Sequence, residues 1–423
     1  MSTQPTQRPV RAPHLAAGAL LRSAVLWAAL GAWAPVAMAQ APAAAPSTGP
    51  EPVRIGLIGP FTGPSADFGL PMQNGVRLAM EEINAVGGYM GRPLELVIKD
   101  DTAKPDVGRK LSEALVAEKV LATIGFCNTG VAQASLEVFQ KARMPLLIPC
   151  ATGTPLTAQY PGPESYIFRT SAKDGIQAPF VVADIVKRGW TKVAVFADTT
   201  GYGEAGLKDV EAALAEHKLS PIHVARFPTG VKDLGAELKA ARDAGANVIV
   251  GYTVGPENAV IAKGRKAMKW DVPFVGPWTL SFPFFIDGAK EAAEGPLMVQ
   301  TFIAEPSNER RASFLANYAR KFKAPKITVP MAAAQGYDTA YLLMHALFGM
   351  RGGQLDGPAL KTALENIQRN FYGVVATYDK PFSATDKDAL TANMLYLGQV
   401  KNGSVTFAYP EDAKRNLFVQ RKQ

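Results

Sequence analysis

Short apolar runs alternate with amphipathic helical patterns along most of this chain. The first run, Val53–Ile58, leads through a Gly/Pro-rich loop to Met72–Val86, where apolar residues recur at helical intervals until Gly87 and Gly88 end the pattern. The series continues with strand Leu94–Ile98, helix Val107–Glu118, strand Val120–Gly125, helix Val131–Ala142 and strand Pro145–Ile148. This alternation predicts βαβ units that build a parallel sheet.

A second series of the same kind begins near Ile176. Its predicted elements are helix Ile176–Arg188, strand Lys192–Phe196, helix Gly203–His217, strand Ile222–Arg226, helix Leu234–Ala244, strand Asn247–Gly251, helix Asn258–Met268, strand Pro273–Gly276 and strand Leu297–Phe302. Three helices, Glu309–Lys323, Met331–Phe348 and Gly357–Gln368, then precede a β-rich tail, Val374–Ala408. Two doubly wound α/β halves followed by a return segment are therefore expected.

The first 39 residues have the parts of a secretory signal. Three arginines and no acid accompany an apolar run, Ser23–Ala34, and small residues lead up to Ala39. The run holds roughly 12 to 15 residues, fewer than the about 20 that a membrane-spanning helix needs. We expect cleavage after Ala39, export to the periplasm, and a flexible Ala/Pro-rich linker over residues 40–52. No Cys lies near the cleavage site to carry a lipid anchor.

Chain length and net charge indicate the number of domains and exclude one class of partner. A chain of 423 residues is long enough for two domains after the leader is removed. The net charge is +8, and three of the positive charges belong to the leader. Because Lys and Arg are scattered and form no run interleaved with aromatic residues, we expect no nucleic-acid partner.

Only two cysteines, Cys127 and Cys150, occur in the chain. They lie at the ends of two predicted neighbouring strands, in a protein expected to reach an oxidising compartment. The sequence leaves open whether they form one disulfide or remain two buried thiols.

Catalytic and metal-binding patterns are missing from the sequence. His217, His223 and His345 do not stand at zinc-ligand spacing, and no GxSxG elbow or GxGxxG loop follows a strand. The cysteines also lack an evident base. We therefore expect neither an enzyme nor a metal or cofactor.

The loops that directly follow the predicted strands are the best candidates for a ligand site, because open parallel sheets bind ligands beyond the carboxyl ends of their strands. These loops are rich in Gly, Thr, Ser or aromatic residues, and they span Gly59–Gly69, Phe126–Gly130, Cys150–Pro155, Asp198–Gly203, Tyr252–Asn258 and Pro277–Pro283. A cleft between two lobes would bring them together.

Several segments, in their order along the chain, read GPFTGPSADFG, INAVGG, GRPLELVIKDD, IGFCNTGVAQA, LLIPCATGTPLT and TGYGEAG. Together they resemble the leucine/isoleucine/valine-binding type of periplasmic solute receptor that serves ABC importers. The resemblance implies two parallel-sheet α/β lobes joined by three crossovers, with the ligand cleft between them. Lobe 1 would comprise residues 53–172 and 300–375, and lobe 2 residues 173–299 and 376–423.

The same resemblance implies the ligand contacts. Thr129 and Thr152 stand where the family holds the ligand carboxylate with hydroxyls and backbone amides, and Cys150 stands where a backbone carbonyl meets the ligand ammonium. Alternatively, the two threonines only cap the helices that follow them.

The expected apolar walls come from aromatic residues. Phe68, Tyr202 and Tyr337 match aromatic positions of the family. Val254 stands where the family often has a further aromatic residue, and Tyr252 would take over its role. Cys127, in the loop with Thr129, completes the expected ligand-binding set. Ordinary core packing is the alternative role for each aromatic residue.

One position departs from the family pattern. Receptors for branched-chain amino acids typically place an acid in a GPEG turn to pair with the ligand ammonium, whereas this chain has GPWT with Trp278. Loss of that acid weakens the case for an α-amino acid, because a buried ammonium needs a carboxylate partner. Glu257 could restore the charge or merely begin the next helix, and indole would suit an acid that lacks an amine.

We thus expect a monomeric, non-catalytic receptor that closes around a small, apolar, carboxylate-bearing solute and delivers it to the membrane subunits of an ABC permease. The solute would be a hydrophobic amino acid or an aromatic or aliphatic organic acid. The alternative is a ligand sensor that responds to amides or acids through the same clamp.

Overall fold

The computed structural model describes residues 50–350, 353–418 and 420–422. The predicted signal peptide and residues 40–49 of the predicted linker lie outside this part. The last linker residues, which we expected to be free of the fold, are bound to it: Arg92 donates from Nε to the carbonyl of Glu51 at 2.7 Å and from Nη2 to that of Pro52 at 3.4 Å. Folded structure therefore begins slightly before the first strand.

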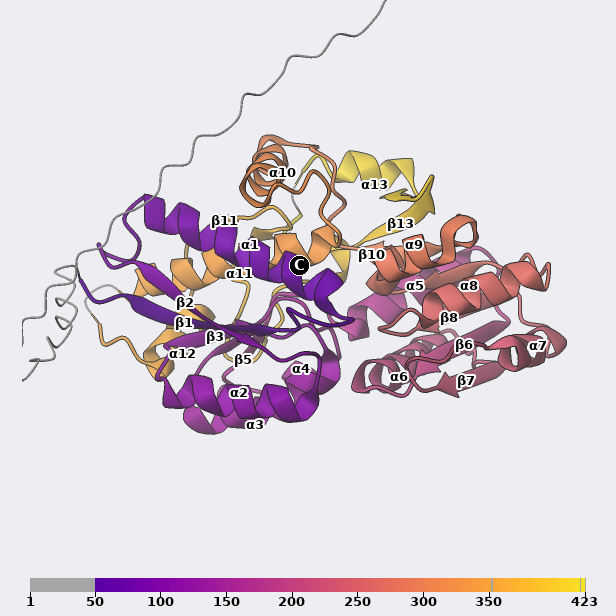
Figure 1. The fold of residues 1–423 in the computed structure, drawn as a ribbon, viewed down its shortest axis with the longest axis horizontal. Coiled ribbons are helices and arrows are strands. Elements are labelled where there is room, and N and C mark those ends of the chain that lie inside the picture. The colour runs from indigo at the N-terminus through magenta and orange to yellow at the C-terminus, as the bar shows by residue number, and fades with distance from the viewer. Residues whose placement is uncertain (1–49, 351–352, 419, 423) are drawn as a thin grey trace, which may run out of the picture. The chain divides into compact units, whose positions relative to one another are not determined.

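The first sheet contains five parallel strands in the order β2-β1-β3-β4-β5 (Figure 1). They are β1 (Val53–Gly59), β2 (Leu94–Asp100), β3 (Ala122–Gly125), β4 (Leu146–Ile148) and β5 (Ile167–Arg169). Both faces of the interior strand β1 are covered, because Ile55 and Leu57 belong to one core cluster and Ile58 to another. These residues fall into two clusters because successive side chains of a strand point to opposite faces of the sheet.

Helices cover both faces of the first sheet. The pair α1 (Ala66–Ala85) and α11 (Pro330–Gly349) packs on one face and the pair α2 (Pro105–Ala117) and α3 (Thr129–Ala142) on the other. Three further helices accompany them: α4 (Pro155–Ala158), α10 (Glu309–Phe322) and α12 (Gly357–Glu365). We call this sheet and its helices lobe 1.

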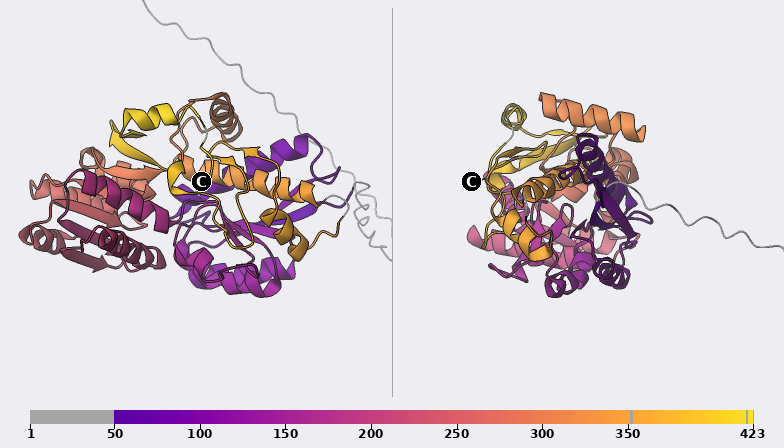
Figure 2. Two further views of the ribbon diagram at one scale, coloured as in Figure 1. Left: turned by 180° about the vertical axis from the view of Figure 1, so that it is seen from behind. Right: turned by 90° about the vertical axis from the view of Figure 1, so that its left-hand side faces the viewer.

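The second sheet has the order β14-β13-β10-β9-β8-β6-β7, and we call it, with its helices, lobe 2. Its strands are β6 (Val193–Asp198), β7 (His223–Phe227), β8 (Val248–Tyr252), β9 (Phe274–Gly276), β10 (Leu297–Gln300), β13 (Tyr396–Lys401) and β14 (Ser404–Phe407). The first five are parallel, whereas β13 pairs antiparallel with β10, and β14 with β13. The view from behind shows the late helix α13 (Pro410–Arg415), in yellow, next to the C-terminal strands of this sheet (Figure 2).

In lobe 2 too, successive side chains of a strand point to opposite faces of the sheet and so belong to two different core clusters. Val195 belongs to the cluster that includes α5 (Asp174–Lys187) and α6 (Gly201–Glu216). Its neighbour Phe196 belongs to the cluster of α7 (Gly235–Asp243), α8 (Glu257–Ala267) and α9 (Pro283–Ala289). Short 3-10 turns complete the lobe: η1 (Trp278–Ser281), η2 (Lys290–Ala293) and η3 (Ala392–Met394).

The chain passes between the sheets three times: after β5, after β10, and after the hairpin of β11 (Phe371–Tyr372) and β12 (Thr377–Tyr378). The third passage lies beside β5, where Arg169 N donates to Lys387 O at 2.8 Å and Ala389 N to Arg169 O at 2.9 Å. The predicted two-lobed α/β fold is confirmed. The predicted β-rich tail contains β12, β13 and β14 (Ser404–Phe407), while residues 379–391 between them form no strand.

Helix α1 begins at Ala66, six residues before the predicted start, and contains Pro71. Proline cannot donate to the carbonyl four residues earlier, that of Asp67. Thr328 Oγ1 donates to that carbonyl at 2.8 Å instead. A distant side chain thus makes an early helix start compatible with proline, and this could not be seen in the local sequence.

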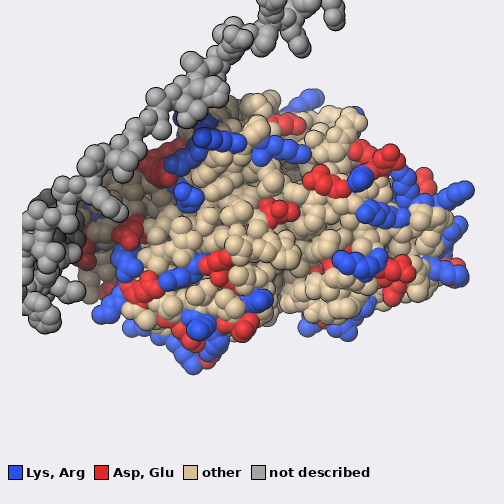
Figure 3. All heavy atoms as spheres, viewed as in Figure 1, with Lys and Arg blue, Asp and Glu red and all other residues tan. Residues whose placement is uncertain are grey.

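On the face shown in Figure 3, basic and acidic side chains are interspersed. Within the described residues, none of the helices combines the length and apolar character needed to cross a membrane. The same part of the chain contains no group of three His, Cys, Asp or Glu residues arranged to hold a metal ion.

Candidate functional site

The two lobes meet at the loops that follow their strands. Phe68 of α1 and Phe282 of lobe 2 have ring centroids 5.0 Å apart. Thr154 Oγ1 donates to Asp209 Oδ2 of α6 at 2.7 Å across the same boundary. Strand-end loops of both lobes are therefore in contact, as the sequence predicted for a cleft.

Cys127 and Cys150 form a disulfide with a Cα–Cα distance of 4.5 Å. This decides between the two states that the sequence left open. The bond joins the loop after β3 to the loop after β4, which are the two loops that carry Thr129 and Thr152.

Thr129 is buried at the first position of α3 and accepts a hydrogen bond from Gly153 N at 3.2 Å. A Cβ at Gly153 would lie only 2.3 Å from Thr129 Cγ2, so glycine permits the close approach of the two loops. The backbone amides at this helix start point into the same region, where the helix dipole favours an anion.

The backbone carbonyl and the side-chain hydroxyl of Thr152 have different surroundings. Its carbonyl accepts from Asp174 N at 2.8 Å and from Arg169 Nη1 at 3.0 Å. The hydroxyl is buried and faces the Asp174 carboxyl, but it has no hydrogen bond of ordinary geometry within the described residues.

Arg169, which sequence analysis did not single out, holds these loops in place. Its side chain is 0% exposed, and it donates to the carbonyl of Gly153 at 2.7 Å, to Thr157 Oγ1 at 2.8 Å and to Asp388 Oδ1 at 2.7 Å. Asp388 lies on the third passage between the lobes and also pairs with Lys173 at 3.1 Å. A charged residue at the end of the apolar run YIFRTS was the available signal.

The lobe 2 side of the boundary carries three predicted residues, Tyr202, Tyr252 and Trp278, each at most 3% exposed. Thr200 caps α6 by accepting from Tyr202 N at 3.2 Å, which fixes Tyr202 in the first helical turn. The rings of Tyr202 and Tyr252 are 5.1 Å apart. Burial, followed by the nearby Asp174, raises the pKa of both tyrosines well above the ordinary value, so both hydroxyls stay protonated.

Trp278 packs against Phe282 with ring centroids 4.7 Å apart, and Phe282 in turn contacts Phe68 of lobe 1. Its backbone N–H donates to Gln177 Oε1 at 3.3 Å. The buried indole Nε1 has no hydrogen-bond partner in the described part of the chain. Trp278 therefore combines an apolar surface with one free donor.

Glu257 and Tyr337 lie in other surroundings. Glu257 is buried at the start of α8, where it accepts from Gly230 N and from Thr253 Oγ1, so both carboxylate oxygens are engaged inside lobe 2. Tyr337, on α11, donates to Glu82 Oε2 at 2.6 Å and packs 5.0 Å from the ring of Phe314. The structure thus brings together the other predicted residues but places Tyr337 in the helical layer of lobe 1.

We use the name interlobe cluster for Thr152, Asp174, Tyr202, Tyr252 and Trp278. Gln177 links them, since its Nε2 donates to Asp174 Oδ1 at 3.3 Å while its Oε1 accepts from Trp278 N. The cluster offers hydroxyls, one carboxyl and aromatic surface. These are the kinds of group that line sites for small ligands with a polar end and an apolar body.

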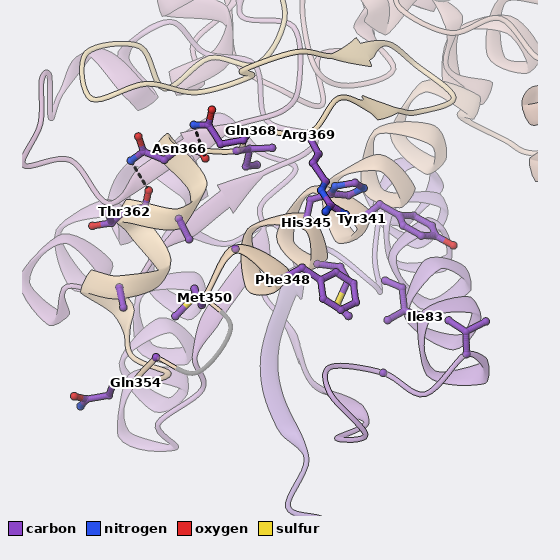
Figure 4. Close-up of a pocket in the computed structure, with 18 of the residues that line it drawn as sticks. Ile83, Tyr341, His345, Phe348, Met350, Gln354, Thr362, Asn366, Gln368 and Arg369 are labelled. Atoms are coloured by element: carbon purple, nitrogen blue, oxygen red, sulfur yellow. Dashed lines mark hydrogen bonds between the residues drawn. The ribbon is translucent and has the colours of Figure 1, made fainter.

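A cavity of about 1200 Å³ lies elsewhere, among α1, α11 and α12 (Figure 4). Its lining comes from the C-terminal parts of α1 and α11, which supply Ile83, Tyr341, His345 and Phe348, and from α12 and the residues that follow it. Burial, and then Arg369, lowers the pKa of His345. Since the interlobe cluster lies at strand ends and helix starts, this cavity is a separate feature, and size alone does not identify the ligand site.

Comparison with known proteins assigns the chain to a protein family. A sequence profile described as periplasmic binding protein matches residues 52–404. The chain is 36% identical over 200 residues to Leu/Ile/Val-binding protein homolog 3 of Brucella melitensis, a match that covers 47% of this chain and 53% of that relative, about half its length. It belongs to the periplasmic binding protein family and is a type I member of the leucine/isoleucine/valine-binding kind.

Two solved structures share the fold. The substrate-binding protein LivJ of Streptococcus pneumoniae, in complex with isoleucine, superposes with a TM-score of 0.71 at 23% identity, covering 84% of this chain and 98% of that one. A solute-binding protein of an ABC transporter from R. palustris, in complex with benzoate, gives 0.70 at 19% identity, covering 84% and 95%. At these identities, the likeness extends to the fold alone.

Proposed function

We propose that this protein is a non-catalytic periplasmic receptor that closes around a small, apolar, carboxylate-bearing solute and presents it to the membrane subunits of an ABC importer. The observation that carries the proposal is the burial of a free hydroxyl, a carboxyl and aromatic rings where the strand ends of two lobes meet. The receptor would act as a monomer after export.

The ligand carboxylate would bind at the loops after β3 and β4. Thr152 offers its free hydroxyl, and Thr129 stands at the start of α3, where backbone amides favour an anion without a full countercharge. The backbone carbonyl of Cys150 and the adjoining Cys127 belong to the same pair of loops.

The apolar part of the ligand would lie against Phe68, Tyr202, Tyr252 and Trp278. Isoleucine and benzoate, the ligands of the two structural neighbours, each join a carboxylate to a compact apolar body. Closure is a hinge motion that the ligand favours because only the closed state offers contacts from both lobes. We expect micromolar or tighter affinity, about 8 kcal/mol of binding free energy.

A thermal-shift screen of purified protein, refolded to remove retained ligand, tests the proposal. The probes are leucine, valine and phenylalanine, together with 4-methylpentanoate, 3-phenylpropanoate and benzoate. At least one should raise the melting temperature, because a ligand that binds only the native state stabilises it. No shift with any apolar carboxylate at millimolar concentration would contradict this function.

Removing either hydroxyl tests the carboxylate site. Thr129→Val and Thr152→Val are each expected to weaken binding of the best probe by about 1 to 3 kcal/mol, because a carboxylate hydrogen bond is lost in a buried site. Isothermal titration calorimetry measures the effect, and Thr191→Val, at an exposed threonine, is the matched control. If both variants bind like wild type, the carboxylate binds elsewhere.

A further inference from the structure

The cavity among α1, α11 and α12 has the composition of a ligand site, and the proposed function makes no use of it. Its volume of about 1200 Å³ exceeds the roughly 300 to 1,000 Å³ of most small-molecule sites. Its floor is apolar and buried, since Ile83, Met344 and Met350 are each at most 8% exposed. The cavity therefore has room for a ligand much larger than a single amino acid.

Two apolar side chains are exposed at the edge of this cavity. Val86, which follows α1, is 86% exposed, and Phe348 of α11 is 41% exposed although its ring centroid lies 6.3 Å from that of Tyr89. Exposed apolar side chains that adjoin an apolar cavity are typical of places where a ligand binds. The methionines of the floor are unbranched and flexible, so they adapt to the shape of what they contact. This lining suits a flexible hydrocarbon chain.

One positive charge borders the cavity without a partner. Arg369, in the segment after α12, is exposed and forms neither an ion pair nor a hydrogen bond with any described residue. Figure 4 shows the side chains of Arg369 and His345 pointing toward one another. Burial, and then Arg369, lowers the pKa of His345, so the imidazole is neutral at pH 7 and the guanidinium supplies the charge.

The nearby carboxylates already have partners. Glu82, which lines the cavity, accepts from the hydroxyls of Tyr337 and Tyr341 at 2.6 and 2.9 Å. Glu365, the last residue of α12, pairs with two lysines at 2.8 and 2.7 Å. Because neither acid pairs with Arg369, its guanidinium remains open to an anion from outside the chain.

We propose that this cavity is a second ligand site, which binds an unbranched aliphatic carboxylate of about eight to twelve carbons, a length at which methylene burial alone gives substantial affinity. The chain would lie over Ile83, Met344 and Phe348, and the carboxylate would pair with Arg369 beside His345. A planar guanidinium holds a carboxylate through two parallel hydrogen bonds. The site does not rest on the proposed function, because it shares no residue with the interlobe cluster.

Isothermal titration calorimetry with hexanoate, octanoate and decanoate tests the apolar part of the site. Each methylene that leaves water strengthens binding by up to about fourfold, so the affinity should rise steadily from hexanoate to decanoate. An affinity that does not change with chain length, or no binding of decanoate at millimolar concentration, would overturn the inference.

Variants of Arg369 test the charged part. Arg369→Gln should weaken decanoate binding by about tenfold, because the charge-assisted hydrogen bonds to the carboxylate are lost. Arg369→Lys keeps the charge but not the planar guanidinium, so its affinity should lie between those of Arg369→Gln and wild type. Arg242→Gln is the matched control, since it removes an exposed arginine from α7 in lobe 2, and it should bind decanoate like wild type.

Two further variants test whether the chain occupies the cavity. Ala363, half-buried on α12, lines the cavity, and Ala363→Phe would place a ring in the space that the chain needs. This variant should lose decanoate binding. Phe348→Ser changes an exposed side chain, so the fold should tolerate it, and it should weaken decanoate several-fold. Circular dichroism checks that each variant is folded, and wild-type affinity in both would contradict the assignment.

Thr152→Val separates the two sites. It should leave decanoate affinity unchanged, and Arg369→Gln should leave unchanged the affinity of the best probe for the interlobe cluster. If decanoate affinity falls in Thr152→Val but not in Arg369→Gln, decanoate binds between the lobes, which overturns the second site while the proposed function stands. A dimer that Val86→Ser dissociates, detected by analytical ultracentrifugation, would show that a second copy covers the apolar edge and would also overturn the inference.

Discussion

Arg169→Met is expected to lower the free energy of unfolding by about 3 to 5 kcal/mol, because it removes one partner of a buried ion pair. The variant keeps the apolar stem but leaves Asp388 with Lys173 as its remaining cationic partner. It also removes the donor to the carbonyl of Gly153. Urea denaturation followed by circular dichroism measures the change.

Lys239→Met is the control, since Lys239 and Asp243 form an ion pair on an exposed helix face, with side chains 70% and 61% exposed. Such pairs contribute under about 1 kcal/mol. Adding Asp388→Asn to Arg169→Met should recover part of the loss, because the poorly compensated carboxylate is then gone. A loss for Arg169→Met no larger than that of the control would contradict the role assigned to it.

The ion pair between Arg169 and Asp388 also makes the stability of the protein depend on pH. Burial by itself raises the pKa of Asp388, but Arg169 and then Lys173 outweigh it and hold the pKa below its usual value. Because the pKa of Asp388 is lower in the folded than in the unfolded state, the ion pair contributes its full stability at pH values above the unfolded-state pKa, near 4. This stability is lost as the pH falls through the lower pKa of the folded state. Arg169→Met should flatten that acid-side decline.

The double variant Cys127→Ser/Cys150→Ser is expected to lose about 3 kcal/mol of stability, because the disulfide closes a loop across a sequence separation of 23 and so restricts the unfolded chain. Urea denaturation again measures it. Reductant should lower the stability of wild type by a similar amount and leave the variant unaffected. Equal midpoints for wild type and variant would show that the bond does not contribute to stability.

The pattern of apolar residues predicted most of the strands and helices correctly, since βαβ units require continuous apolar strands and amphipathic helices. It missed β5, whose three residues, Ile167–Arg169, are too few to show a period. The early start of α1 was also missed, because Thr328, far along the chain, compensates Pro71.

For the site, strand-end loops and the family resemblance pointed to Thr129, Thr152 and the aromatic residues. Neither pointed to Asp174, because an acid at a helix start ordinarily lies in solvent and complements the helix dipole. In the folded protein it is fully buried, with Tyr252 of the same lobe and Thr152 of lobe 1 beside it. Arg169 was missed for a related reason: its partner Asp388 is far away in sequence and reaches it through the third passage between the lobes.

The sequence by itself determined the family, the two-lobed α/β architecture and the loops proposed to hold the ligand, because hydrophobic periodicity and local motifs can be read along the chain. Tertiary structure decided that Cys127 and Cys150 are bonded, that Tyr337 belongs to a helical layer, and that Asp174 is fully buried. These properties depend on distances between segments remote in sequence, and only the packed lobes set those distances.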